Sequence, residues 1–259
     1  MKVKSKDIAS AITNYLKNHG FEQFAPKAVL FDMDGVLYDS MPNHVVAWQQ
    51  SMDSFGIHMT ADDAYATEGA RGIDTIRQMV AAQQHRDISL EEAQRMYDEK
   101  TRRFHEMPKP KVMPGIPELM QQIKDCGLSI GVVTGSGQRP LFNRLLTDFA
   151  GYLDEQHITT AYDVSIGKPA PDPYLMGMKR AGGVAPWQTI VVENAPLGVR
   201  AGVAARAFTI AVNTGPLPDK ILAEAGASLV LGDMYELNSL WQQLSPITKR
   251  QTPPPVGGG

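Results

Sequence analysis

Two acidic residues, Asp32 and Asp34, stand two positions apart directly after the apolar run KAVLF. Carboxylates held this close repel each other, so one of them takes up a proton unless a cation lies nearby. A divalent cation removes the conflict, and Mg²⁺ commonly binds one or two carboxylates together with a phosphate oxygen. The pair therefore indicates metal-assisted chemistry on a phosphate compound, in which a carboxylate attacks or transfers a proton.

Donors that suit a phosphate follow at two further places. Thr134, Gly135 and Ser136 come directly after the apolar run LSIGVV, and Lys168 lies in the stretch GKPAPDP, just before an expected helix. Hydroxyl and amide donors can hold phosphate oxygens, while the lysine supplies a point charge. We expect these residues to bind the group that is transferred.

A third polar pair, Glu193 and Asn194, ends the apolar run TIVV. Runs of this kind are rich in Val and Ile and show no polar alternation, as is typical of strands buried on both faces. They lie at 27–31, 128–135, 189–194 and 208–215. Because helical stretches separate them, the sequence predicts an α/β fold with a Rossmann-like, doubly wound parallel sheet. Such sheets bind ligands at the carboxyl ends of their strands, so the polar pairs should meet.

Residues 41–109 break this alternation and show only helical spacing. Two capping boxes, Thr60–Asp63 and Ser89–Glu92, mark expected helix starts, and the proline-rich MPKPKVMPG closes the segment. We expect an all-helical cap domain inserted into a core domain that comprises 25–40 and 110–245.

The two ends of the chain lie outside this core. Residues 1–24 form an N-terminal extension, in which apolar side chains at helical spacing predict a helix over 6–18 that packs on this chain or on a second subunit. The tail 246–259 is rich in Pro and Gly and is expected to be disordered.

These motifs, in this order, resemble the haloacid-dehalogenase-like superfamily of phosphotransferases over roughly residues 26–240. The resemblance implies a Mg²⁺-dependent reaction through an aspartyl-phosphate. It makes Asp32 the nucleophile and a metal ligand, and Asp34 the general acid/base whose backbone carbonyl also binds the metal. It implies that the phosphate is held by Thr134 and Lys168, and that the metal site is completed by Glu193 and Asn194. Relatives usually carry Asp at the position of Asn194, so we expect metal binding to persist with lower affinity.

The helical insert and the stretch SMPNHVVAW further resemble the β-phosphoglucomutase-like branch of this superfamily. By that likeness, His44 lies beside the site and the loop 67–75 reads the leaving group. In that loop Glu68 and Arg71 are expected substrate contacts, although they could instead pair with each other on the surface. Glu68 stands where mutases generally carry a basic residue, which favours a leaving group that brings its own cation. Inorganic pyrophosphate is therefore the favoured substrate, and the motifs look closest to bacterial pyrophosphatase-like members.

Other functions stay open. A β-phosphoglucomutase or a sugar-phosphate phosphatase is the alternative enzyme, and a catalytically silent binding protein is the alternative from another class. Asp39, just downstream of the acidic pair, is expected to cap a helix at the hinge rather than to react.

Composition excludes several other classes. The chain has 259 residues, of which 43% are hydrophobic, and a net charge of −3, so no basic field suggests a nucleic-acid partner. No apolar run approaches the roughly 20 residues that span a bilayer. The single Cys126 favours a reducing, cytoplasmic location. A small phosphate compound is the expected partner; the oligomeric state is left open, with a monomer favoured.

Overall fold

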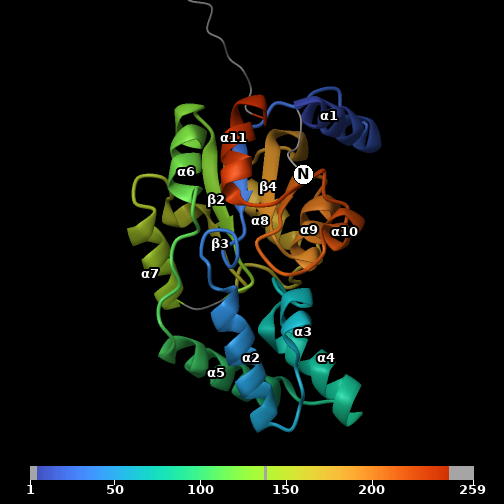
Figure 1. The fold of residues 1–259 in the computed structure, drawn as a ribbon, viewed down its shortest axis with the longest axis vertical. Coiled ribbons are helices and arrows are strands. Elements are labelled where there is room, and N and C mark those ends of the chain that lie inside the picture. Colours follow the sequence, from blue (N-terminus) through green and yellow to red (C-terminus); the bar gives the residue numbers. More distant parts are fainter. Residues whose placement is uncertain (1–4, 137–138, 245–259) are drawn as a thin grey trace, which may run out of the picture.

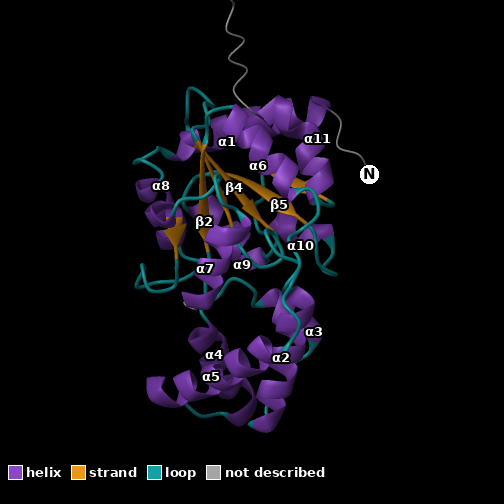
Figure 2. Ribbon diagram, turned by 90° about the vertical axis from the view of Figure 1, so that its left-hand side faces the viewer, coloured by secondary structure: helices purple, strands orange, loops and turns teal. Residues whose placement is uncertain are grey.

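The computed structural model describes residues 5–136 and 139–244 of the chain. A sheet flanked by helices forms one half of the molecule, and a bundle of helices forms the other half (Figures 1 and 2). The α/β class with an inserted helical part, predicted from the alternation of apolar runs and helical spacing, is confirmed.

The sheet is parallel and has the strand order β3-β2-β1-β4-β5-β6. Its strands are β1 (Ala28–Phe31), β2 (Ser129–Val133), β3 (Ile158–Thr159), β4 (Thr189–Glu193), β5 (Phe208–Val212) and β6 (Leu229–Leu231). The four predicted runs correspond to β1, β2, β4 and β5, which are almost wholly buried. β3 and β6 are edge strands that the sequence analysis missed.

Side chains of the strands alternate between two hydrophobic layers, because successive residues of a strand point to opposite faces. Val29 and Phe31 of β1 join a cluster with the helices α1 (Ser5–His19), α6 (Ile116–Asp125), α7 (Arg139–Asp148) and α11 (Met234–Leu244). Leu30 faces the other side, which is covered by α8 (Asp172–Arg180) and α9 (Pro196–Ala204), with α10 (Asp219–Glu224) beside them. This double covering holds the ends of the strands in fixed register.

The insert between β1 and β2 consists of α2 (Met41–Ser54), α3 (Ala61–Ala66), α4 (Gly72–Gln84) and α5 (Leu90–Glu106). It has its own apolar core, which includes Trp48, Met52 and Ile76. Thr60 and Asp63 form the complete predicted capping box. At the second predicted box Ser89 caps the amide of Glu92, but the Glu92 carboxylate binds Arg86 instead of returning to Ser89.

The chain leaves the sheet for the insert and returns from it at one place. Tyr38 pairs with Val112 in an antiparallel bridge. On either side of this bridge the Asp39 amide donates to the Lys111 carbonyl at 2.9 Å, and the Met113 amide donates to the Leu37 carbonyl at 2.8 Å. The two connections therefore form a short, paired hinge.

Helix α1 covers the predicted stretch 6–18 and packs on this chain. Tyr15 is buried against Phe208 of β5, and its hydroxyl donates to the carbonyls of Pro186 and Arg206. The predicted disordered tail, 246–259, lies outside the described residues. Within 5–136 and 139–244, no helix combines the length and the apolar character needed to cross a membrane.

Candidate active site

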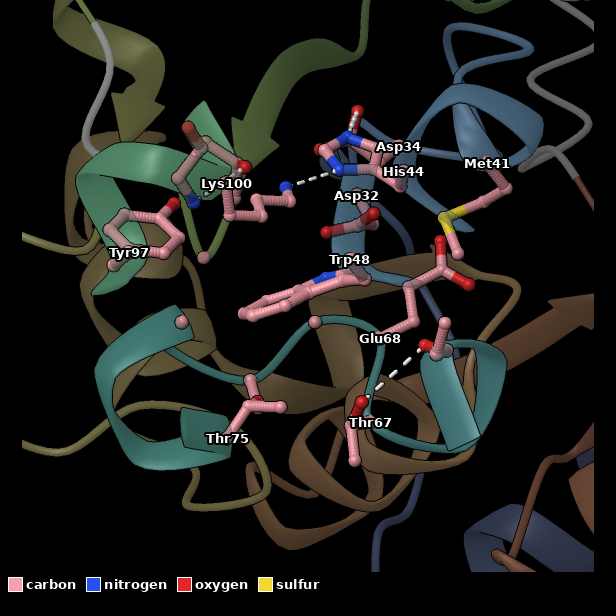
Figure 3. Close-up of a pocket in the computed structure, with 17 residues that line it drawn as sticks. Asp32, Asp34, Met41, His44, Trp48, Thr67, Glu68, Thr75, Tyr97 and Lys100 are labelled. Atoms are coloured by element: carbon pink, nitrogen blue, oxygen red, sulfur yellow. Dashed lines mark hydrogen bonds and ion pairs between the residues drawn. The ribbon is translucent and has the colours of Figure 1, made fainter. Parts of the chain in front are cut away.

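The polar groups that follow β1, β2 and β4 meet at one edge of the sheet, facing the insert. A cavity of about 60 Å³ lies there, and Asp32, Asp34 and Thr134 from the sheet side line it together with His44, Glu68 and Lys100 from the insert (Figure 3). The predicted convergence of the strand ends follows from parallel pairing, because β1 is hydrogen-bonded to both β2 and β4.

Lys168 lies at the centre of this edge and is paired with two acids. Its ammonium donates to Asp32 Oδ1 at 2.5 Å, to Glu193 Oε1 at 2.6 Å and to the Val133 carbonyl at 3.1 Å. Tyr174 of α8 donates a further hydrogen bond to Glu193 Oε1 at 2.6 Å. All of these side chains are buried, so the ion pairs are not screened by water.

The pKa values reflect this crowding of charge. Burial raises the pKa of Asp32 to about 7, with Glu193 and Asp34 adding to the rise and Lys168 opposing it. For Lys168, burial disfavours the ammonium, but Asp32 and Glu193 outweigh burial and raise its pKa. Lys168 therefore stays charged, while Asp32 needs more positive charge nearby to be fully ionised.

The donor set fits a hard cation, and an unpaired oxygen marks where it would bind. Asn194 Oδ1 is buried and has no hydrogen-bond partner among the described residues, although its Nδ2 donates to Glu68 Oε1 at 2.9 Å. Both Glu193 oxygens are occupied: Oε1 by Lys168 and Tyr174, and Oε2 by backbone amides at 3.1 and 3.4 Å. Asn194 is thus better placed than Glu193 to coordinate directly.

In the described part of the chain, His, Cys, Asp and Glu side chains form no group of three or more that could hold a metal by themselves. Mg²⁺ does not require such a cage, because carbonyl oxygens, water and substrate phosphate complete its shell. The predicted carbonyl ligand of Asp34 and the amide oxygen of Asn194 belong to this kind of site. The Asn194 side chain can lie this close to the backbone after Asp34 because residue 35 is glycine. A Cβ at Gly35 would lie 2.0 Å from Asn194 Nδ2.

Asp34 is held by Ser40, the residue that precedes the insert, and by His44 of α2. Ser40 donates to its Oδ1 at 2.6 Å, and His44 Nε2 lies 3.1 Å from the same oxygen. Burial raises the pKa of Asp34, but His44 and the hydrogen bonds from His44 and Ser40 outweigh it and lower the pKa to about 2. Asp34 is therefore ionised in this conformation.

Lys100 of α5 completes a chain of contacts that the sequence analysis missed. Its ammonium lies 2.6 Å from His44 Nδ1, and it sits 5.0 Å from the ring of Trp48 and 5.2 Å from that of Phe104. Donation from Lys100 to Nδ1 leaves the Nε2 proton of His44 directed at Asp34. The available signal was a lysine at helical spacing between the aromatic residues Tyr97 and Phe104, on the face of α5 that carries Met96.

The predicted phosphate loop is short and closely covered. Thr134 is buried on the cavity, and its Oγ1 accepts a hydrogen bond from the Ser136 amide at 3.0 Å. A Cβ at Gly135 would lie 2.7 Å from the carbonyl oxygen of Gly69, so the insert rests directly on this loop. Phosphate binding by Thr134, Gly135, Ser136 and Lys168 stays a prediction that this arrangement suits.

The two expected substrate contacts of loop 67–75 point in different directions. Glu68 is buried on the cavity beside Asn194, and burial raises its pKa well above the usual value. Arg71 lines a neighbouring groove, where it binds Asp74 at 2.8 Å and the Ser165 carbonyl at 2.8 Å. The two do not pair with each other, and substrate contact by Arg71 stays a prediction that this conformation does not favour. Asp39 does not line the cavity, but its expected role as a helix cap is wrong, because the N-cap residue of α2 is Ser40.

A family model described as haloacid dehalogenase-like hydrolase matches residues 29–212. The chain therefore belongs to this family of hydrolases, in agreement with the resemblance carried by its motifs. Several of its relatives are named as phosphatases, which supports a phosphatase-type enzyme of this family.

Three relatives indicate the branch. Hexitol phosphatase A of Escherichia coli is 34% identical over 187 residues, which are 72% of this chain and 83% of that protein. The phosphorylated carbohydrates phosphatase of Thermotoga maritima is 30% identical over 220 residues, 84% of this chain and 100% of that protein. A solved structure described as "Putative beta-phosphoglucomutase from Bacteroides vulgatus" superposes with a TM-score of 0.89 at 46% identity, over 93% of this chain and 98% of that one.

These comparisons correct one expectation. The relatives named above are phosphatases of carbohydrate phosphates or a protein described as a sugar-phosphate mutase, and none is a pyrophosphatase. The resemblance to bacterial pyrophosphatases thus gains no support, and the alternative substrate class, a sugar phosphate, fits the relatives better. That expectation rested on the charge of Glu68 and on the likeness of the motifs to bacterial pyrophosphatases, and the relatives named above do not share the substrate that it suggested.

Proposed function

We propose that this protein is a Mg²⁺-dependent phosphohydrolase that cleaves the phosphate ester of a small sugar or sugar alcohol through an aspartyl-phosphate. The observation that carries the proposal is the meeting of Asp32, Asp34 and Lys168 at one edge of the sheet. A buried carboxylate beside an ammonium, with a second carboxylate two residues on, supplies a nucleophile, a charge partner and a proton carrier.

In the first half-reaction an Asp32 oxygen attacks phosphorus as the bond from phosphorus to the leaving oxygen breaks. Asp34 gives its proton to that oxygen, so the sugar leaves as an alcohol. The low pKa of Asp34 without substrate requires that the negative charge of the bound phosphate raise it, as a like charge does. Lys168 and the Thr134 loop balance the charge on the transferred oxygens.

In the second half-reaction Asp34, now ionised, takes a proton from a water molecule whose oxygen attacks phosphorus. The bond from phosphorus to Asp32 breaks, which frees the carboxylate and releases inorganic phosphate. Mg²⁺, when bound by Asp32, the Asp34 carbonyl and Asn194, would supply positive charge beside the transferring group. His44 keeps Asp34 oriented throughout, through its contact at 3.1 Å.

The size of the cavity requires the insert to move. About 60 Å³ is well below the roughly 150 Å³ of a cavity that holds benzene, so a hexose phosphate does not fit the closed arrangement. The paired hinge at Tyr38 and Val112 is a natural place for the opening. Closure afterwards excludes bulk water while the ester is cleaved.

Pyrophosphate is the second candidate, and a specific observation favours it. Glu68 is 8% exposed and faces the expected metal position beside Asn194, where a carboxylate repels a bare phosphate but attracts one that carries a cation. Pyrophosphate is also small. Retention of the phosphoryl group, as in a mutase, would instead need a second phosphate-binding group on the insert, where Glu68 stands.

The test is a phosphate-release screen with and without Mg²⁺. It includes a hexitol phosphate, a hexose phosphate, pyrophosphate and β-glucose 1-phosphate, with isomerisation of the last followed separately. The proposal expects the highest kcat/KM on a sugar or sugar-alcohol phosphate. A preference for pyrophosphate of tenfold or more would establish the second candidate instead, and glucose 6-phosphate formation without phosphate release would establish the mutase.

A further inference from the structure

Arg71 reaches from the insert to the segment that carries Lys168. Its Nη1 donates to the Ser165 carbonyl at 2.8 Å, while Nε and Nη2 hold the Asp74 carboxylate at 2.8 and 3.2 Å. The aliphatic part of the side chain lies on Gly167, where an added Cβ would come within 2.8 Å of Arg71 Cγ. The arginine therefore spans both halves of the molecule one residue ahead of Lys168.

A second contact of the same loop lies on Lys168 itself. A Cβ at Gly69, which has φ +83°, would lie 3.3 Å from Lys168 Cδ, and the Gly69 carbonyl covers Gly135. The loop thus rests on both expected phosphate-binding segments at once. Because the contacts are close on both sides, the Lys168 segment cannot shift without moving the loop.

We propose that Arg71 is a positioning residue that couples closure of the insert to the placement of Lys168. When the insert closes, the guanidinium binds the Ser165 carbonyl and its stem covers Gly167, which fixes the backbone just before the lysine. Arg71 touches no reacting atom in this role. The inference rests on the proposed phosphoryl-transfer function and extends it to the residue that completes the site on closure.

The ion pair with Asp74 does not account for these contacts by itself. Arg71 and Asp74 are 36% and 47% exposed, and pairs so exposed contribute little to stability. The pair instead orients the guanidinium, since two of its nitrogens are held by one carboxylate. Of the hydrogen bonds that Arg71 makes, the one to the Ser165 carbonyl joins the insert to the core.

A double-mutant cycle with Arg71→Ala and Gly167→Ala tests the coupling on the best substrate of the screen. Arg71→Ala is expected to lower kcat about tenfold with little change in KM, and Arg71→Lys, which keeps a cationic donor, should recover part of the loss. Gly167→Ala should cost several-fold alone, because its methyl group displaces Arg71, but should cost nothing further in the Arg71→Ala background. Equal cost of Gly167→Ala in both backgrounds would overturn the proposal. So would unchanged kcat in Arg71→Ala.

Hydrogen exchange of the protein without substrate separates this inference from the proposed function. Backbone amides over 160–170 should exchange several-fold faster in Arg71→Ala than in the wild type. Arg77→Ala, which removes an exposed arginine of α4, the helix that begins directly after Arg71, is the matched control and should match the wild type in exchange and in kcat. If the amides over 160–170 exchange faster in Arg71→Ala but the protein cleaves no phosphate ester, the proposed function is wrong, whereas the role of Arg71 in holding this segment is supported. Exchange that does not respond would sink the inference, whatever the substrate.

Discussion

Asn194 and Glu68 are hydrogen-bonded across the cavity, with the amide nitrogen of the first 2.9 Å from a carboxylate oxygen of the second. The bond joins the carboxyl end of β4 to the insert. It also turns the other atom of the amide, Oδ1, into a buried position with no partner among the described residues. An asparagine can serve both a carboxylate and a cation in this way, whereas an aspartate cannot donate to Glu68.

Replacing Asn194 by Asp should make the protein more dependent on its metal. Without Mg²⁺ the substitution removes the hydrogen bond from Asn194 to Glu68 and adds another acid beside the buried Asp32 and Glu193, so the thermal midpoint in EDTA is expected to fall by several degrees. With Mg²⁺ in excess the additional charge binds the cation more tightly, and the gain in midpoint on adding Mg²⁺ should exceed that of the wild type. Thermal unfolding of both proteins in EDTA and across a Mg²⁺ series measures this. Equal gains in the two proteins would show that Asn194 is not a ligand.

Glu68→Gln should change substrate preference. The amide keeps the size of the side chain but removes the carboxyl group, which ionises most readily when a leaving group brings a cation beside it. We expect the ratio of kcat/KM for pyrophosphate to that for a hexitol phosphate to fall about tenfold, equivalent to about 1.4 kcal/mol. Asp62→Asn, an exposed acid of α3, is the control for a general loss of charge. An unaltered ratio would remove Glu68 from the selection of substrate.

Asp32→Asn should abolish turnover while leaving the protein folded. The amide cannot form the phosphoryl ester, and a loss of 10³-fold or more in kcat is expected from removal of a nucleophile. Asp39→Asn provides a matched control only seven residues away, because Asp39 is exposed and does not line the cavity. Phosphate release by both variants, with circular dichroism to check the fold, gives the answer. Comparable activity of the two would refute the assignment of the nucleophile.

Lys100 should give the stability a specific dependence on pH. Burial lowers the pKa of Lys100 to about 8, and the charge of Asp34 opposes this only in part. The folded state thus disfavours the charged lysine at pH below 8, and this cost disappears as the pH rises from about 8 toward the unfolded value of 10.5. The wild type should therefore gain on the order of 3 kcal/mol over Lys100→Met across that range.

Urea unfolding of both proteins at several pH values between 7 and 11 measures the difference. Lys220→Met removes an exposed lysine of α10 and should follow the wild type at every pH. A constant difference between wild type and Lys100→Met would mean that the buried lysine does not change its charge in this range. In activity, Lys100→Met is expected to be impaired as well, because His44 loses the donor that directs its Nε2 proton at Asp34.

The parallel sheet and the meeting of the strand ends were predictable because long runs such as LSIGVV combine β-branched residues with abrupt polar ends. The strands β3 and β6 could not be predicted, because β3 has only two residues and β6 only three, too few to show a sequence pattern. They are strands because they pair with β2 and β5. Short edge strands of this kind are defined by tertiary pairing.

Within the site, residue types could be predicted but directions could not. Lys100 would be placed on a solvated helix face by its charge, yet aromatic neighbours and His44 keep it buried. Arg71 is three positions from Glu68 in the sequence, yet its side chain points away from the cavity. This direction follows from the packing of Arg71 on Gly167, which the sequence does not reveal. Tyr174 of α8 was not singled out in the sequence, and it reaches Glu193 because α8 packs against β1, the strand next to β4.

The bridge between Tyr38 and Val112 has a consequence for how such molecules diversify. Because the chain departs and returns at adjacent positions, the whole insert is an exchangeable module whose removal cuts no strand. Recombination at this point can replace the part that contacts the leaving group while Asp32, Lys168 and Glu193 keep their places. The same core can thus act on new substrates when the insert is exchanged, while the catalytic residues stay the same.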